Sequence, residues 1–97
     1  MPFYFILGKY TKEGITKIKD APDRYEKAKK AAQAVGGEIK SLHYTLGRYD
    51  FISLIEAPNN EAMMQLLFML GRGGVISTET LVAIPAEKGA EILKKFL

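Results

Sequence analysis

Apolar residues follow two different spacings along this chain, and the changes between them predict its order of elements. Runs rich in aromatic and β-branched residues predict strands, and apolar positions three or four apart predict helices. Strands are expected over residues 3–10, 38–46, 49–57 and 74–84, and helices over 22–35, 61–70 and a segment that begins at Pro85. The polar stretch 11–19 is expected to form a loop or a short helical turn.

Asparagine, aspartate and glycine residues stand between these segments and predict where each one starts or stops. Asp20 is expected to cap the first long helix, and Asn59 or Asn60 the second. Gly36-Gly37 should end the first helix, because glycine tolerates a left-handed closing residue. Gly47-Arg48 predicts a hairpin turn between the second and third strands.

The predicted order is β-α-β-β-α-β followed by a C-terminal helix, which indicates an α+β fold of the ferredoxin-like kind. In that fold two β-α-β halves joined by a hairpin form a four-stranded antiparallel sheet, with both main helices on one face. A chain of 97 residues has room for one hydrophobic core, so residues 1–97 are expected to form a single domain.

Both faces of the predicted sheet carry apolar side chains. Alternate residues of the first strand form two sets, Phe3, Phe5 and Leu7 on one side and Tyr4, Ile6 and Tyr10 on the other. Two helices cover only one face, so the other face needs the C-terminal helix or the same face of a second copy. We expect face-to-face pairing of two sheets, as in a dimeric α/β barrel, and therefore a homodimer or a larger homo-oligomer.

The second long helix is apolar around most of its circumference. Core packing accounts for residues such as Met63 and Leu66, whereas Met64 and Phe68 lie one turn apart on another side. Met64 and Phe68 are therefore candidates for contact with a partner subunit, with the last helix, or with an apolar ligand that the adaptable methionine side chain accommodates.

Tyr49 and Asp50 stand at the start of an otherwise apolar strand. Because burial of an unpaired carboxylate is costly, Asp50 needs a partner. It is either a structural anchor, which accepts backbone N–H bonds or pairs with Arg48 or Arg72, or a member of a polar cluster with Tyr49 and His43 that faces a pocket. In the second case Asp50 and His43 are candidate catalytic bases.

The other polar positions give weaker indications of a catalytic or binding site. Glu79, between two threonines of the fourth strand, is either solvated at an edge or a second pocket carboxylate. No metal-ligand spacing surrounds His43, which is the only histidine, so neither a metal site nor a cofactor is expected. The glycine-rich residues 71–74 follow a helix and precede a strand, whereas a phosphate loop leads into a helix.

The composition excludes several classes of protein. The chain has no cysteine, which excludes disulfides and cysteine nucleophiles and fits a reducing cytoplasm. Its N-terminus lacks the features of a signal peptide, and no apolar run approaches the roughly 18 residues that span a bilayer. We therefore expect a soluble, cytoplasmic protein without a membrane segment.

The formal net charge of +3 raises the question of nucleic-acid binding. Residues 47–54 partly match the third-strand pattern of RNA-recognition domains, which share this order of elements. Asp50, however, replaces a small residue of that pattern and would repel phosphate, and the acidic and basic residues are interspersed along the chain. Nucleic acid is not an expected partner.

The stretch Gly47-Arg48-Tyr49-Asp50 resembles the motif that names the GYD-domain family, with Arg48 at a variable inserted position. The similarity extends to about Pro85, through residues 14–24, Gly36-Gly37, residues 56–58 and residues 78–81, although Ala21 stands where a Ser or Thr cap is expected. This resemblance implies a ferredoxin-like fold and self-association, and a relation to dimeric α/β barrels, some of which use a pocket between sheet and helices. It implies no particular activity.

We expect a homo-oligomeric module that binds a small molecule, such as a small apolar ligand, and serves as a sensor or carrier. Its pocket is expected between the sheet and the helix 61–70, with candidate contacts at Tyr49, Asp50, His43, Met64, Phe68 and Glu79. One alternative is a cofactor-free enzyme, similar to a monooxygenase or isomerase, with His43 or Asp50 as the base. Another is a structural interaction domain.

Overall fold

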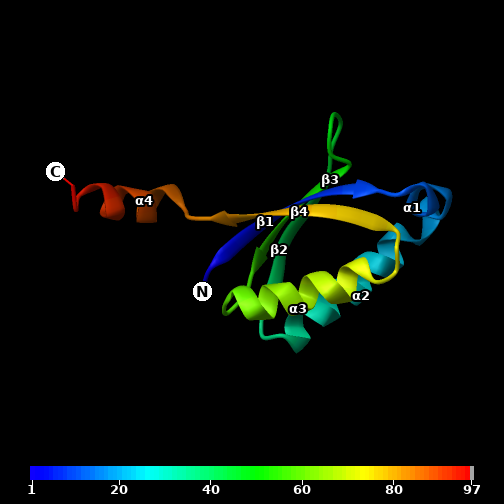
Figure 1. Ribbon diagram of the computed structural model, residues 1–97, viewed down its shortest axis with the longest axis horizontal. Helices are drawn as coiled ribbons and strands as arrows, with labels where there is room; N and C mark the ends of the chain where they lie inside the picture. Colours follow the sequence, from blue (N-terminus) through cyan, green and yellow to red (C-terminus); the bar gives the residue numbers. More distant parts are fainter. Residues whose placement is uncertain (97) are drawn as a thin grey trace.

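The computed structural model describes residues 1–96. The strands are β1 (Phe3–Tyr10), β2 (Glu38–Tyr44), β3 (Phe51–Glu56) and β4 (Ile76–Ala83). The helices are α1 (Lys12–Thr16), a 3₁₀ turn (Ile18–Asp20), α2 (Ala21–Ala34), α3 (Asn60–Gly71) and α4 (Ala86–Leu93). Figure 1 shows α2 and α3 together on one side of the sheet and α4 extending away from it.

The four strands form a single antiparallel sheet in the order β2-β3-β1-β4. Tyr4 in β1 lies opposite Ile55 in β3 and Val82 in β4. The two central strands therefore come from the two different β-α-β halves, which confirms the predicted α+β, ferredoxin-like fold.

The hydrophobic core lies between the sheet and its two covering helices. Alternation along β1 and β3 sends every second side chain into this layer, and α2 and α3 close it with small and apolar residues. The buried apolar residues are Tyr4, Ile6, Ala32, Phe51, Ile55, Ala57, Met63 and Leu66.

The opposite face of the sheet, which we call the open face, is not covered in the structure. Its apolar side chains include Phe3, Phe5, Leu7, Ile52, Leu54 and Leu81, and none of them is buried. The C-terminal helix does not close over it, because α4 continues outward from the end of β4 and none of its residues is buried (Figure 1). An intramolecular lid formed by α4 is thus not the arrangement of residues 1–96.

The two long helices begin differently. The Asn59 side-chain oxygen accepts a hydrogen bond from the Ala62 N–H at 2.8 Å, which confirms this cap of α3. The predicted Asp20 cap was wrong, since the Asp20 side chain makes no capping bond. The reason is that Ile18–Asp20 already forms a 3₁₀ turn, so Asp20 has a helical backbone instead of the extended one that a cap requires.

Glycines end the elements as predicted, although the hairpin is wider. Gly36 adopts a φ of 83° at the end of α2, and Gly74 a φ of 72° before β4. The Thr45 N–H donates to the Asp50 carbonyl at 2.9 Å, so the β2–β3 connection is a loop over residues 45–50 instead of a two-residue turn at Gly47-Arg48.

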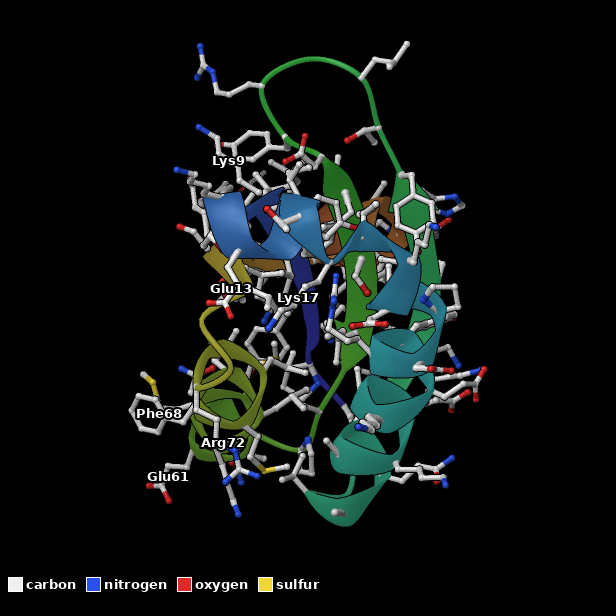
Figure 2. The ribbon with its side chains drawn as sticks, turned by 90° about the vertical axis from the view of Figure 1, so that its right-hand side faces the viewer. Lys9, Glu13, Lys17, Glu61, Phe68 and Arg72 are labelled. Atoms are coloured by element: carbon white, nitrogen blue, oxygen red, sulfur yellow. The ribbon has the colours of Figure 1, made fainter. Side chains whose placement is uncertain are left out.

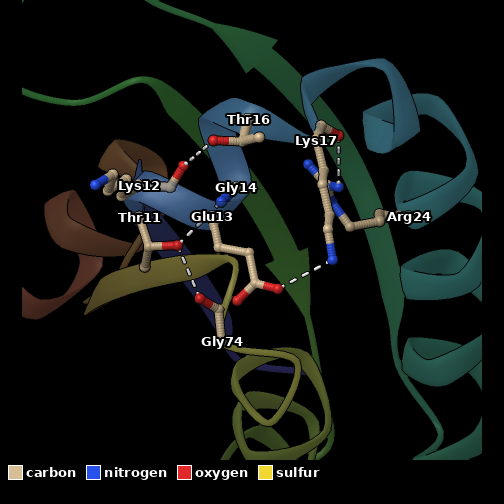
Figure 3. A network of polar contacts seen from close by, with 8 residues as sticks. All are labelled: Thr11, Lys12, Glu13, Gly14, Thr16, Lys17, Arg24 and Gly74. Atoms are coloured by element: carbon tan, nitrogen blue, oxygen red, sulfur yellow. Dashed lines mark hydrogen bonds and ion pairs between the residues drawn. The ribbon is translucent and has the colours of Figure 1, made fainter.

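The segment after β1, left open as a loop or short turn, forms the short helix α1. Thr11 accepts a hydrogen bond from the Gly14 N–H at 3.1 Å and donates one to the Gly74 carbonyl at 2.8 Å (Figure 3). This single hydroxyl therefore joins the start of α1 to the segment that leads into β4.

Candidate functional site

A cavity of ≈120 Å³ lies between α2 and the covered face of the sheet. Helix α2 contributes Ala21, Arg24, Tyr25 and Ala28, and the sheet contributes mainly apolar side chains such as Ile6 and Phe51. Helix α3 contributes only Leu70. The cavity is therefore a site of α2, whereas the sequence led us to expect one beneath residues 61–70.

Short side chains on α2 account for this space. Ala21 and Ala28 are two helical turns apart, so they lie on the same side of the helix and line the cavity together. Their methyl groups do not reach the sheet, and the gap between helix and strands stays unfilled. The walls that surround it are apolar, with Ile39, Leu42 and Ile55 among them.

Arg24 is the only charged residue that lines this cavity in the part of the chain that the structure describes. Its Nη1 donates to the backbone carbonyl of Lys17 at 3.1 Å, which draws the side chain back toward the end of α1 (Figure 3). Its Nη2 is buried and has no hydrogen-bond partner among residues 1–96. No described carboxylate forms an ion pair with it.

Two tyrosines from the sheet also line the cavity, Tyr10 of β1 and Tyr44 of β2. Burial raises the pKa of the Tyr10 hydroxyl, and the neighbouring Tyr44 raises it further, while the positive charge of Arg24 acts in the opposite direction. Arg24 and the two tyrosines thus line the same cavity. The raised pKa keeps the Tyr10 hydroxyl protonated near neutral pH, so it is able to donate a hydrogen bond.

Asp50 occupies the position of a structural anchor. Its Oδ2 accepts a hydrogen bond from the Tyr10 N–H at 2.9 Å, which is the backbone role proposed for it from the sequence. It forms no ion pair with Arg48 or Arg72 among the described residues. Asp50 does not line the cavity.

Two other predicted site residues meet on the side of the open face. The Tyr49 hydroxyl donates to Glu79 Oε1 at 2.8 Å, and the Lys9 ammonium lies 5.7 Å from the centre of the Tyr49 ring. The hydrogen bond to Glu79 raises the pKa of the Tyr49 hydroxyl. His43 is exposed on β2, opposite Ile52, and is not part of this contact.

Met64 and Phe68 lie on the outer side of α3, where they are 52% and 70% exposed. Figure 2 shows Phe68 pointing outward from α3, away from the sheet. The structure therefore brings Tyr49 and Glu79 together but keeps them apart from Met64 and Phe68. None of the six predicted contacts lines the cavity, and a role in ligand contact stays a prediction for each of them.

Sequence reasoning missed Arg24, Tyr10 and Tyr44 as site residues. A signal was present in α2, where Ala21, Arg24 and Ala28 recur at helical spacing. Because the two alanine side chains are short, this side of the helix leaves a gap between α2 and the sheet, next to the charge of Arg24. From the sequence alone, this pattern does not differ from that of an ordinary packed helix with a basic residue on its solvated face.

The described residues contain neither a cluster of metal ligands nor a membrane-spanning helix. Residues 1–96 hold no group of three or more histidine, cysteine or acidic side chains placed to bind a metal ion. No helix in that range has both the length and the hydropathy needed to cross a membrane.

Comparison with known proteins agrees with this architecture. The family model described as the GYD domain matches residues 4–93, nearly the whole chain. The chain belongs to the GYD-domain family. This GYD-domain protein is 27% identical over 86 residues to the glutamine synthetase and cystathionine beta-lyase binding protein of Thermus thermophilus, a match that covers 88% of this chain and 90% of the relative.

Solved structures share the fold at lower sequence identity. The feast or famine regulatory protein of M. tuberculosis, complexed with L-methionine, superposes with a TM-score of 0.67 at 16% identity over 88% of the GYD-domain chain. That match spans 51% of the regulatory protein, so this chain corresponds to about half of it. The protein FFRP-DM1 gives a TM-score of 0.59 at 24% identity, with 87% of this chain and 100% of the other covered.

Proposed function

We propose that this GYD-domain protein is a homo-oligomeric module that binds a small molecule and acts as a sensor or carrier. The observation that carries the proposal is the cavity beneath α2, in which apolar walls surround one buried guanidinium nitrogen without a partner. Ligand pockets typically combine mostly apolar walls with a few polar groups that orient the ligand.

Self-association belongs to the same proposal. The open face presents Phe5 and Leu81 at 37% and 45% exposure, beside Leu54 and Phe3 in a shallow apolar hollow. A contiguous apolar surface of this kind marks an interaction site in a stable protein. The same face of a second copy offers matching chemistry, because a two-fold axis places each patch against itself.

The relatives support a binding role over catalysis. One solved neighbour is a regulatory protein that holds L-methionine, and the curated relative is named for binding two enzymes. A module that combines a ligand cavity with a surface for protein contact suits both descriptions. The absence of cysteine supports a cytoplasmic location as part of this proposal.

Thermal unfolding in the presence of small apolar molecules tests the proposal. The panel should contain neutral, cationic and anionic compounds, because any ligand that binds only the folded state raises the unfolding temperature. Ala28→Leu fills the cavity from α2, and Ala34→Leu adds the same volume at an exposed position of that helix.

We expect at least one class of compound to stabilise the wild-type protein and the Ala34→Leu variant but not Ala28→Leu. If no class stabilises the wild-type protein, and native mass spectrometry finds no retained small molecule, the binding function is refuted. Equal stabilisation of Ala28→Leu would refute the cavity as the binding site.

A further inference from the structure

The charge of Arg24 and the apolar walls around it specify the chemistry of the ligand of this cavity. We propose that the cavity binds a small monocarboxylic acid that has an apolar tail and no amino group, with the carboxylate at Arg24 and the tail beneath α2. This inference rests on the proposed function and narrows it to one class of ligand.

The side chain of Arg24 is the reason to expect an anionic group on the ligand. A guanidinium keeps its positive charge at any pH that proteins encounter. Arg24 therefore cannot avoid the cost of burying a charge by losing a proton. Its Nη2 is buried without a partner, whereas buried polar groups in proteins are nearly always hydrogen-bonded. A carboxylate oxygen supplies the missing acceptor and balances the charge, in the kind of contact for which arginine is best suited.

Tyr10 and Tyr44 extend the site for the same anion. Both line the cavity, and both hydroxyls are able to donate hydrogen bonds. Tyr44 is 60% exposed, so it stands at the open side of the cavity. A carboxylate at this end would accept from Arg24 with one oxygen and from a tyrosine hydroxyl with the other.

The remaining walls select an apolar tail. They include Ile6, Ala28, Ile39, Leu42 and Ile55, none of which donates or accepts a side-chain hydrogen bond. The one serine in the lining, Ser53, already donates to the Ser41 carbonyl at 2.8 Å. The cavity of ≈120 Å³ is similar in size to cavities of about 150 Å³ that hold benzene, so a tail of four to six carbons is of the right order.

No acidic side chain lines the cavity within the described residues. Asp50, which directly precedes the lining residue Phe51, accepts a hydrogen bond from the Tyr10 N–H. An ammonium group on the ligand would therefore lose its hydration without gaining an anionic partner, and a second carboxylate would find no second cation. The cavity thus favours a simple monocarboxylate over an α-amino acid such as the L-methionine held by the regulatory neighbour.

Three probes that share one carbon skeleton test the effects of the carboxylate and of the amino group separately. They are 4-methylpentanoate, its neutral amide 4-methylpentanamide, and L-leucine, which is the same acid with an α-amino group. Isothermal titration calorimetry on the full chain measures each affinity. We expect 4-methylpentanoate to bind about tenfold or more tightly than the amide, since a hydrogen bond to a charged group is worth at least that factor. It should also bind more tightly than L-leucine, whose ammonium group would lose its hydration without gaining an anionic partner.

Two arginine variants form a matched pair. Arg24→Met keeps the length of the side chain and removes its charge, and Arg48→Met makes the same change in the exposed β2–β3 loop. We expect Arg24→Met to lose the preference for the acid over the amide and Arg48→Met to keep it. Circular dichroism verifies that both fold, and if Arg24→Met does not, the three-probe series on the wild-type protein decides the question.

Equal binding of the acid and the amide, tighter binding of L-leucine, or an unchanged preference in Arg24→Met would each overturn the carboxylate assignment. If compounds of another class bind and Ala28→Leu blocks them, the binding function stands and only the ligand class is wrong. If no compound of any class binds, both proposals fall together.

Discussion

The carboxylate of Asp50 accepts a hydrogen bond from the backbone N–H of Tyr10 at 2.9 Å, across 40 residues of sequence. The Asp50 N–H in turn donates to the carbonyl of Gly8 at 2.7 Å. Both bonds lie where β1 ends and the β2–β3 loop returns to the sheet. Asp50 thus ties the naming motif of the family to the strand that carries Tyr10 into the cavity.

Removal of this carboxylate should destabilise the fold. Asp50→Ala leaves the Tyr10 N–H without its acceptor, and we expect the free energy of unfolding to fall by about 1–3 kcal/mol. Asp50→Asn retains an oxygen acceptor and should lose less. Urea unfolding measures both, with Asp23→Ala on the exposed side of α2 as the control. A stability of Asp50→Ala equal to that of the wild-type protein would rule out the anchor role.

The Tyr10 hydroxyl should make stability depend on alkaline pH. Burial raises its pKa, so the folded protein holds this proton more tightly than the unfolded chain does. The contribution is fully present below the ordinary tyrosine pKa of about 10 and is lost as the pH rises through the raised pKa of the folded state. Tyr10→Phe has no such proton, so its stability should decline less between about pH 8 and pH 11. Parallel declines of the two proteins in urea titrations would contradict this.

A charge on the open face tests the proposed self-association. Phe5→Lys places an ammonium in the middle of this face, at a position opposite Leu54 and Leu81. Because the phenylalanine is not part of the buried core, we expect the fold to persist while native mass spectrometry shows a smaller assembly. Phe68→Lys on the outer side of α3 is the matched control. Dissociation by Phe68→Lys instead of Phe5→Lys would place the contact on α3.

Gly14 should not tolerate a side chain. A methyl group at this buried position would lie 2.0 Å from the Val75 carbonyl oxygen, which is backbone and cannot rotate away. We expect Gly14→Ala to cost about 1–3 kcal/mol, the usual range for overpacking. Gly71→Ala at the end of α3 meets no atom within 4 Å and should not lower the unfolding temperature. Equal unfolding temperatures for the two variants would contradict this account.

The elements of this fold were predictable because each depends on neighbours in sequence. The alternation of Phe3, Tyr4, Phe5 and Ile6 assigns a strand and its two faces without knowledge of any partner. Asn59 and Gly36 mark helix ends through bonds to residues within four positions. The prediction of an Asp20 cap was wrong because the pattern of apolar residues does not reveal the 3₁₀ turn just before α2.

The candidate site was less predictable, because its residues come from distant segments. Arg24 looks like any basic residue on a helix until the structure shows that its Nη2 is buried beside the cavity. Asp50 and Tyr49 stand next to each other in sequence, yet one bonds the backbone of β1 and the other reaches Glu79 on β4. Sequence proximity grouped them, whereas the path of the β2–β3 loop sends their side chains to different strands.

By itself, the sequence determined the α+β class, the four strands, and an apolar surface on both sides of the sheet, since these follow from local periodicity. Only the tertiary structure decided that α4 leaves one side bare and that the cavity lies under α2. The physical reason is that a cavity is space left between side chains of separate elements. Its position depends on how Ala21 and Ala28 of α2 are placed against the strands, and the sequence of α2 alone does not determine that placement.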